Sequence, residues 1–366
     1  MIMNLALKNV NALPAPTWNR LGINDTELQA KIAALAPYGG RKPLSPLPVG
    51  VTVSELPFPA PDVETGMGKD AADFVQENKT YGVSLRAAAG IRPGAPVFLN
   101  FRLDEENPAL ADVVEITAEE NSELTVVVSY RSGERYADFH GGLTKLYAAK
   151  GAAIHLVQVQ LLGDGCTHFD NVGAFAEENG SIDIIQAELG GRKAVSGVKT
   201  RLEGTKSRLN MDTIYFGDRS RAIDMNYVAE HTGRKTKSEI HVAGALLDES
   251  EKTFRGTIDF VRGSKQAVGH ESEYNLLFSP KVRNRTAPLI LCSEEDVEGQ
   301  HAASTGKIDE NRLFYLMSRG LSELEAKKLM IEAQFRPVTD RIPDDTLRKA
   351  IMDYVKVRLS GLESMG

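Results

Sequence analysis

The sequence has little cysteine, since Cys166 and Cys292 are the only thiols among 366 residues and stand far apart. No Cys-x-x-Cys pair occurs, so the chain cannot by itself supply the four thiolates of a structural zinc or iron–sulfur site. Cys292 ends the aliphatic run at 289–291, where we expect a buried, inert thiol. Cys166 lies in a glycine-rich loop, where we expect a more exposed one. A bound metal would therefore need other ligands.

Long apolar runs and blocks of like charge are also missing. The net charge of −7 comes without an acidic or basic block, which argues against a nucleic-acid partner or an anionic membrane surface. No apolar run approaches the roughly 20 residues that cross a bilayer. The first ten residues lack the charged start and apolar core of a secretory signal. We predict a cytoplasmic protein with neither nucleic acid nor membrane as a partner.

The familiar catalytic motifs are absent as well. The chain has no Gly-x-x-x-x-Gly-Lys-Ser/Thr, because Gly306-Lys307 is followed by Ile308. Neither His-Glu-x-x-His nor Gly-x-Ser-x-Gly occurs. ATP hydrolysis by a phosphate-binding loop and the common hydrolase mechanisms are thus disfavoured. The prediction is a chain that is not an enzyme.

One enzymatic alternative stays open. Asp212, Asp218 and Asp224 would face a groove if the chain formed a β-helix, as the acid and base groups of polysaccharide-cleaving β-helices do. Their spacing is irregular, so a solvated face is the favoured interpretation of these three residues. The alternative function is a carbohydrate-active β-helix enzyme.

The segment 1–80 is predicted to be a helical segment followed by a connector. Leu28, Ile32 and Leu35 have helical spacing within residues 26–35, and Asp25 is a plausible cap. Residues 37–61 hold seven of the 16 prolines, a density that neither a helix nor a central strand can carry.

From 81 to 300 the pattern changes to short β-type runs separated by Gly, Asn and Asp. A weak internal repeat aligns Leu124, Ile154 and Ile182, each after a turn of small or polar residues, at spacings of 30 and 28 residues. Such a period is typical of stacked coils, because each coil buries its aliphatic side chains only against its neighbours. We predict a mainly β fold with a parallel β-helix core; a β-sandwich is the alternative.

The segment 301–366 is predicted to form three helices. Asp309 is expected to cap the first, and Gly320 to end it. Ser322 and Glu325 form a capping box for the second, whose predicted apolar face is Ala326, Leu329, Met330 and Ala333. The third has an apolar stripe of Leu347, Ala350, Ile351, Tyr354 and Val355. We expect these helices to shield the open end of the solenoid.

The seven histidines do not form a recognisable metal motif. His155 alternates with aliphatics and is expected on the outside of a coil. Five others stand alone in polar surroundings, where exposure at the surface is the default: His140, His168, His231, His241 and His270. His301 differs, because its Gly-Gln-His-Ala-Ala run leaves the imidazole unobstructed as a ligand for iron. A hydrogen-bonded structural role is the competing interpretation.

The C-terminal third resembles the SufB/SufD family of iron–sulfur cluster assembly proteins, and its SufD branch more than its SufB branch. The resemblance rests on Pro288-Leu-Ile-Leu, on Asp296-Val-Glu-Gly-Gln-His-Ala-Ala-Ser-Thr-Gly, and on Leu313-Phe-Tyr-Leu-Met-Ser-Arg-Gly. Similarity of pattern extends over about two thirds of the chain. It implies a right-handed parallel β-helix with helical ends.

The resemblance also implies partners and a site. A SufC-like ABC-type ATPase would dock on the C-terminal helices, which include Phe314, Tyr315, Arg319 and Gly320. A SufB-like subunit, or a second copy of the chain, would pair along the β-helix. The chain would then be a scaffold that shares a transient iron–sulfur cluster or iron with its partner and binds no cofactor tightly alone. The family is also associated with reduced flavin, although no flavin motif is present.

The family's metal motif is only partly preserved. Its cysteine, two residues before the histidine, is replaced by Gly299, while the histidine is present as His301. His301 is therefore the candidate metal ligand, and Cys292 a weaker one. The remaining thiolates would come from the paired subunit.

Overall fold

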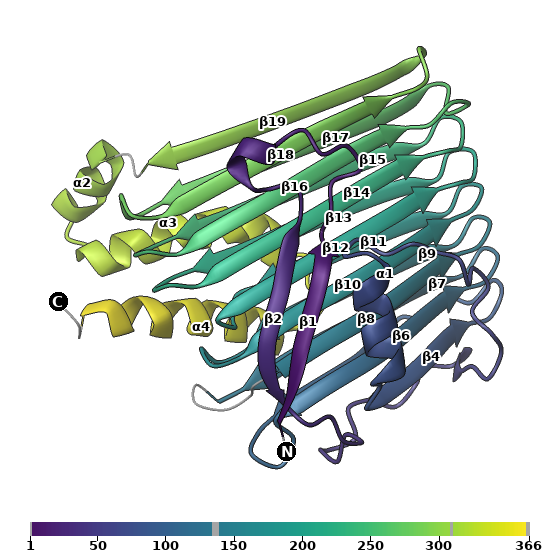
Figure 1. Cartoon of the computed structure of the whole chain (residues 1–366), viewed down its shortest axis with the longest axis horizontal. Coiled ribbons are helices and arrows are strands. Elements are labelled where there is room, and N and C mark those ends of the chain that lie inside the picture. Colours follow the sequence, from purple (N-terminus) through teal and green to yellow (C-terminus); the bar gives the residue numbers. More distant parts are fainter. Residues whose placement is uncertain (1, 134–138, 308–309, 364–366) are drawn as a thin grey trace.

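The computed structural model describes residues 2–133, 139–307 and 310–363, and its core is a parallel β-solenoid (Figure 1). From residue 81 onwards, successive strands alternate between two sheets and pair in parallel with strands one coil away, whereas Val51–Val53 pairs antiparallel with the first of them. Within the described residues, one sheet contains β3 (Val51–Val53), β4 (Tyr81–Ala87), β6 (Ala109–Ala118), β8 (Phe139–Ala148), β10 (Thr167–Ala176), β12 (Lys193–Leu202), β14 (Ala222–His231), β16 (Glu251–Phe260) and β18 (Arg283–Cys292). The facing sheet contains β5 (Val97–Leu103), β7 (Glu123–Ser132), β9 (Ala153–Leu161), β11 (Ser181–Glu188), β13 (Arg208–Gly217), β15 (Lys237–Leu246), β17 (Ala267–Leu277) and β19 (Val297–Lys307). We call them the nine-stranded and the eight-stranded sheet.

The repeat in the sequence marks successive coils, as predicted. Ile154 pairs in register with Leu124 on one side and Ile182 on the other, and all three side chains are fully buried in the solenoid interior. The turn before each strand contains a residue with positive φ: Asn121, Gly151 and Asn179. Asn and Gly tolerate this left-handed conformation best, which explains their recurrence. The β-sandwich alternative is wrong.

The predicted helix at residues 26–35 is wrong. Residues 2–33 instead form an antiparallel hairpin of β1 (Ile2–Val10) and β2 (Thr26–Ala33), whose connection contains a short 3-10 helix, Asn19–Leu21. Leu28 and Ile32 are both buried on one face of β2, because a spacing of four residues also repeats on one face of a strand. The hairpin and α1 (Lys69–Glu77) pack against the outer face of the nine-stranded sheet.

Three C-terminal helices are present where they were predicted: α2 (Glu310–Ser318), α3 (Glu323–Thr339) and α4 (Asp345–Glu363). Gly320 follows α2 with φ 97°, and the capping box of Ser322 and Glu325 is formed. Asp309, the expected cap of α2, lies outside the described residues. Among the described helices, none is long and apolar enough to cross a membrane.

The apolar faces of the last two helices agree only partly with the prediction. On α4, Leu347, Ile351 and Val355 are buried as expected. On α3, Ala326 and Met330 are buried as predicted, but Leu329 is 45 % exposed and Ala333 is exposed as well. The other buried positions are Ile331, Phe335 and Val338. The buried face of α3 therefore differs from the predicted one in the second half of the helix, where the helix contacts the sheet.

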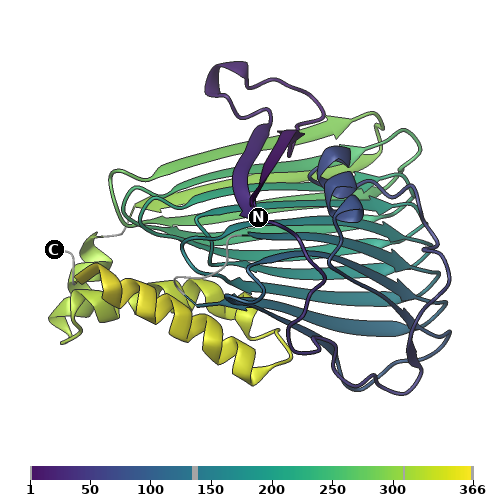
Figure 2. The same cartoon turned by 60° about the horizontal axis from the view of Figure 1, so that its bottom comes forward.

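The expected position of these helices at the end of the solenoid is wrong. α3 and α4 cover the outer face of the eight-stranded sheet, where Ile331 and Phe335 join outward-facing residues such as Ile185 and Ile214 in one apolar cluster. The hairpin and these helices thus lie on opposite faces of the solenoid (Figure 2). Both outer faces are covered in this way, and the last coil is left open.

Candidate functional site at the open end of the solenoid

The last coil exposes two strand edges. β18 is the final strand of the nine-stranded sheet and β19 of the eight-stranded sheet, and neither has a further strand beside it within the described part of the chain. The side chains of both strands are mostly exposed or partly exposed, unlike those of the coils before them. Such edges present unpaired backbone N–H and C=O groups and are ready to pair with another chain.

His301 lies within β19 rather than at a strand–helix junction. Its neighbour in register on β17 is Glu271, whose neighbour on β15 is Ile240, a residue of the interior core. Side chains in register on adjacent strands point to the same face, so His301 belongs to the interior-facing row. It is nevertheless exposed, because no further coil covers β19. His301 therefore lies at the open end of the solenoid that β18 and β19 form, which we call the mouth.

Beneath this mouth lies a buried polar cluster that sequence reasoning missed. The Lys252 ammonium forms an ion pair with Glu273 and donates to Thr286 Oγ1 at 3.1 Å, and Thr286 donates to Glu273 Oε2 at 2.6 Å. Lys252 and Glu273 are almost completely buried. The alternation Glu271-Ser-Glu273 was the available signal, since both carboxylates fall on one face of a strand.

Glu271 is the member of this cluster next to His301. Burial, together with the charge of Glu273 and against that of Lys252, raises the pKa of Glu271 to about 8. Its carboxylate occupies the space above Gly256, where an added Cβ would lie 2.1 Å from Glu271 Oε2. A carboxyl group that titrates near neutral pH thus sits below the open imidazole.

This carboxyl group predicts how stability depends on pH. Between the ordinary pKa of 4.5 and the folded value of about 8, the folded chain holds a proton that the unfolded chain has lost. The free energy of unfolding should therefore fall as the pH rises through this window. Glu271→Gln removes the effect, so its stability relative to the native chain should rise by about 2–4 kcal/mol from about pH 5 to pH 8.5, as urea unfolding would measure.

Glu298→Gln is the matched control for Glu271→Gln, because Glu298 lies on β19 with its side chain 58 % exposed. Its unfolding free energy should follow that of the native chain across the same pH range. Parallel curves for Glu271→Gln and the native chain would show that Glu271 has an ordinary pKa.

The two cysteines are placed opposite to expectation. Cys292 is exposed at the end of β18, because the last coil has no cover, and its Sγ contacts the Glu294 carbonyl oxygen at 3.0 Å. Cys166 is buried, because its loop folds back onto the interior core. Cys292 is in register with the buried Phe260. His301 and Cys292 thus lie at the same end of the solenoid, on strands of different sheets.

The structure leaves no room for a side chain at Gly299, the position where the family's motif has a cysteine. A Cβ at Gly299 would lie 2.9 Å from the Phe260 ring and 3.3 Å from the Ile290 side chain. A cysteine there would require the Phe260 ring to move. Gly299 and Phe260 are therefore compatible as a pair, and the mouth offers an imidazole without the adjacent thiolate.

A second exposed feature lies on α2. Phe314 is 72 % exposed and Tyr315 54 %, and the Arg319 guanidinium lies over the Tyr315 ring, 5.1 Å from its centroid. Gly320 is exposed at the helix end. Apolar and aromatic side chains exposed together on one helix are typical of a docking surface.

The surface placement predicted for three histidines is wrong. His140, His168 and His231 are fully buried, whereas His241 and His270 are partly exposed and His155 lies on the outer side as expected. His231 contacts Thr236 and Ser238, and burial lowers its pKa to about 4. The 28-residue separation of His140 and His168 was the missed signal, because it equals the spacing of Ile154 and Ile182.

The candidate acid and base groups of a carbohydrate enzyme are engaged elsewhere. Asp212 forms an ion pair with Arg341. Asp218 accepts hydrogen bonds of 2.7 and 2.9 Å from Arg358. Asp224 forms an ion pair of 2.6 Å with Arg255. Each carboxylate is thus paired with an arginine that is distant in the sequence, and no observation favours a role in glycoside cleavage.

The fold and the donors of its last coil define a parallel β-solenoid protein with an uncapped end. The model of the family "SUF system FeS cluster assembly, SufBD core domain" matches residues 101–334. The chain therefore belongs to the SufBD family. The matched residues span strands β6 to β19 and continue into α3.

Several curated relatives are similar over most of this chain. The iron-sulfur cluster assembly protein SufD of Bacillus subtilis is 25 % identical over 277 residues, which are 75 % of this chain and 63 % of the relative. An iron-sulfur cluster assembly SufBD family protein of Pyrococcus horikoshii is 27 % identical over 282 residues, 76 % of this chain and 62 % of the relative. SufD of Escherichia coli is 24 % identical over 243 residues, 66 % and 57 % respectively. The chain thus spans less than two thirds of the length of these relatives.

Proposed function

We propose that the chain is a non-catalytic scaffold subunit of a SUF-type iron–sulfur cluster assembly complex. The observation that carries the proposal is the open last coil, which combines two unpaired strand edges with an accessible imidazole. The relatives named as assembly proteins support the same role.

Pairing would occur along β18 and β19. A SufB-like subunit, or a second copy of this chain, would continue both sheets by adding its own edge strands, and main-chain hydrogen bonds would supply much of the affinity. The interior-facing rows of the two solenoids would then meet. His301, exposed in the free chain, would become enclosed at the subunit interface.

The cargo at this interface would be iron and sulfide. His301 would offer its imidazole to iron, and thiolates would come from the paired subunit, with Cys292 as a weaker candidate from this chain. Ligands that are divided between two subunits suit a cluster that must be released after assembly. Neither subunit would hold the cluster tightly alone.

The α2 surface would dock a SufC-like ABC-type ATPase. Its aromatic side chains Phe314 and Tyr315 provide the apolar contact, and Arg319 provides charge beside them. Because α2 begins at Glu310, three positions after β19 ends at Lys307, motion of the docked ATPase would be passed to the strand that contains His301. This connection gives ATP hydrolysis by the partner a route to the mouth of the solenoid.

Co-purification tests this proposal through Phe314→Asp. The tagged full chain is expected to retain a SufB-like subunit and an ABC-type ATPase, and the substitution should weaken ATPase binding by at least about tenfold, because it places a charge in an apolar contact. Phe314 is so exposed that the melting temperature should hardly change.

Val357→Asp is the matched control, since Val357 is a 57 % exposed apolar residue on α4. It should retain the ATPase in full. The docking assignment is wrong if Phe314→Asp retains as much ATPase as Val357→Asp.

A further inference from the structure

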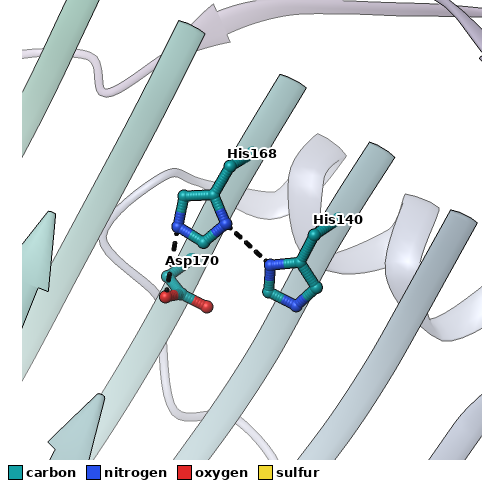
Figure 3. A group of neighbouring side chains, drawn as sticks. All are labelled: His140, His168 and Asp170. Atoms are coloured by element: carbon teal, nitrogen blue, oxygen red, sulfur yellow. Dashed lines mark hydrogen bonds and ion pairs between the residues drawn. The ribbon is translucent and has the colours of Figure 1, made fainter. Parts of the chain in front are cut away.

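Deep inside the solenoid, two histidines and three carboxyl groups form one contiguous cluster, and Figure 3 shows three of its members, His140, His168 and Asp170. His140 on β8 and His168 on β10 are in register, and Asp170 follows two residues after His168. Asp112 approaches from β6 and Glu188 from β11, in the facing sheet. All five side chains are nearly or completely buried. The cluster lies many coils away from His301 and has no part in the site at the mouth.

One side of His168 is fully occupied by a hydrogen-bonded chain. His168 Nδ1 lies 2.7 Å from His140 Nδ1, and His140 Nε2 lies 2.7 Å from Asp112 Oδ1. Tyr130 in turn donates to Asp112 Oδ2 at 3.1 Å. In one order of this chain, His168 Nδ1–H donates to His140, whose Nε2–H donates to Asp112. The outer groups then fix the orientation of the His168 ring, as outer groups do for metal-binding histidines.

The other side of His168 has no hydrogen-bond partner. Its Nε2 atom lies 3.4 Å from Asp170 Oδ2 and 3.4 Å from Glu188 Oε2, and it is unsatisfied although fully buried. Asp170 Oδ1 is also buried without a partner. A charge-assisted N–H···O bond is usually about 2.7–2.9 Å long, so both contacts are long for hydrogen bonds. Asp170 and Glu188 thus flank the same atom of His168 without closing on it, and Glu188 Oε2 also accepts a hydrogen bond of 3.2 Å from Gln160.

The charges at this point do not balance. Asp170 and Glu188 carry two negative charges when ionised, and within the described ranges neither forms an ion pair with a lysine or arginine. A protonated His168 would leave one negative charge uncompensated in the interior, which is costly. A divalent cation with a neutral His168 would bring the total to zero.

The spacing also fits a small metal ion. Zinc-like cations bind imidazole nitrogen and carboxylate oxygen at about 2.0–2.2 Å, and tetrahedral geometry then separates two ligand atoms by about 3.4 Å. Both contacts of His168 Nε2 have this length. A mixed set of one nitrogen and two oxygens suits Zn²⁺, Co²⁺ or Fe²⁺ better than Ca²⁺, which requires six or more oxygens.

We propose that His168, Asp170 and Glu188 bind one divalent cation of the zinc type, which the chain acquires as it folds. His168 and Asp170 come from the nine-stranded sheet and Glu188 from the eight-stranded sheet. The ion therefore joins the two sheets across the interior, as a structural site does. This site is separate from the cargo site at His301 and does not depend on the proposed function.

Refolding with Co²⁺ tests the proposal, because tetrahedral Co²⁺ absorbs visible light. The full chain is unfolded with a chelator, refolded with or without Co²⁺, and desalted. The native chain is expected to retain about one Co²⁺ per molecule with visible bands, and to melt at a higher temperature than the metal-free chain. Asp170→Asn and Glu188→Gln should each lower the retained Co²⁺ at least about tenfold.

Glu239→Gln is the matched control, because Glu239 faces His270 in register at 3.0 Å on the outside of the solenoid. It should retain Co²⁺ like the native chain. If the core variants fail to fold, the native chain alone decides, through its Co²⁺ content and its melting temperature with metal and with chelator. A native chain that retains no Co²⁺ and melts identically in both conditions overturns the proposal, as does full retention by Asp170→Asn and Glu188→Gln.

Discussion

Replacing Ile154 with Asp is expected to lower the free energy of unfolding by several kcal/mol, which would leave little of a typical domain's stability. Ile154 is fully buried in the middle of β9, between Leu124 and Ile182 on neighbouring coils. An aspartate there has no cation to pair with in this aliphatic row. The folded chain must then either bury an unpaired carboxylate or protonate it at neutral pH, and both cost a large amount of free energy. Urea unfolding followed by circular dichroism would measure the loss.

Two controls separate the buried charge from a general effect of substitution at this strand. Ile154→Val removes one methylene and should cost only about 0.5–1.5 kcal/mol. Ala153→Asn alters the preceding, partly exposed residue and should change stability by about 0.5 kcal/mol or less. A melt of Ile154→Asp that matches that of the native chain would mean that these aliphatics do not stack inside the solenoid.

The solenoid itself was predictable because its repeat is encoded locally. Each coil places an aliphatic residue after a turn, and in these three coils the turn contains Asn or Gly with positive φ, so Leu124, Ile154 and Ile182 reveal the period. The N-terminal hairpin was not predictable in the same way. Leu28 and Ile32 are four residues apart, and this spacing places both on one face of a helix or of a strand. Only the partner strand β1 decides between the two.

The helices illustrate a second limit. Their capping signals are local, so Ser322 and Glu325 mark the start of α3 correctly. Where a helix packs depends on which surface offers complementary apolar side chains. The outward-facing Ile185 and Ile214 of the eight-stranded sheet provide that surface, and no pattern in the helices themselves distinguishes it from the end of the solenoid.

The candidate site was predictable at one residue only. His301 could be singled out from its neighbours in the sequence, but Glu271 becomes relevant only through the register between β17 and β19. The two cysteines were misplaced because exposure was inferred from flanking residues. Cys292 follows an aliphatic run, yet it is exposed because the last coil has no neighbour.

The second large effect is expected for His301→Ala. His301 is exposed on the last strand, so its removal should leave the melting temperature and the assembled complex unchanged. Reconstitution of the full complex with iron and sulfide should then fail to develop the iron–sulfur absorbance that the native complex develops. A histidine with a structural hydrogen bond would behave differently, because its loss should cost about 1 kcal/mol of stability and spare the cluster.

Gln300→Ala is the matched control for His301→Ala, because Gln300 precedes His301 on β19 and belongs to the opposite face of the strand. It should assemble clusters like the native chain. His301→Cys should restore part of the absorbance, since a thiolate is also a good ligand for iron. Assembly by the His301→Ala complex at the native rate and yield would place the iron ligand elsewhere, and a loss of the complex itself would indicate that His301 contributes to pairing rather than to binding iron.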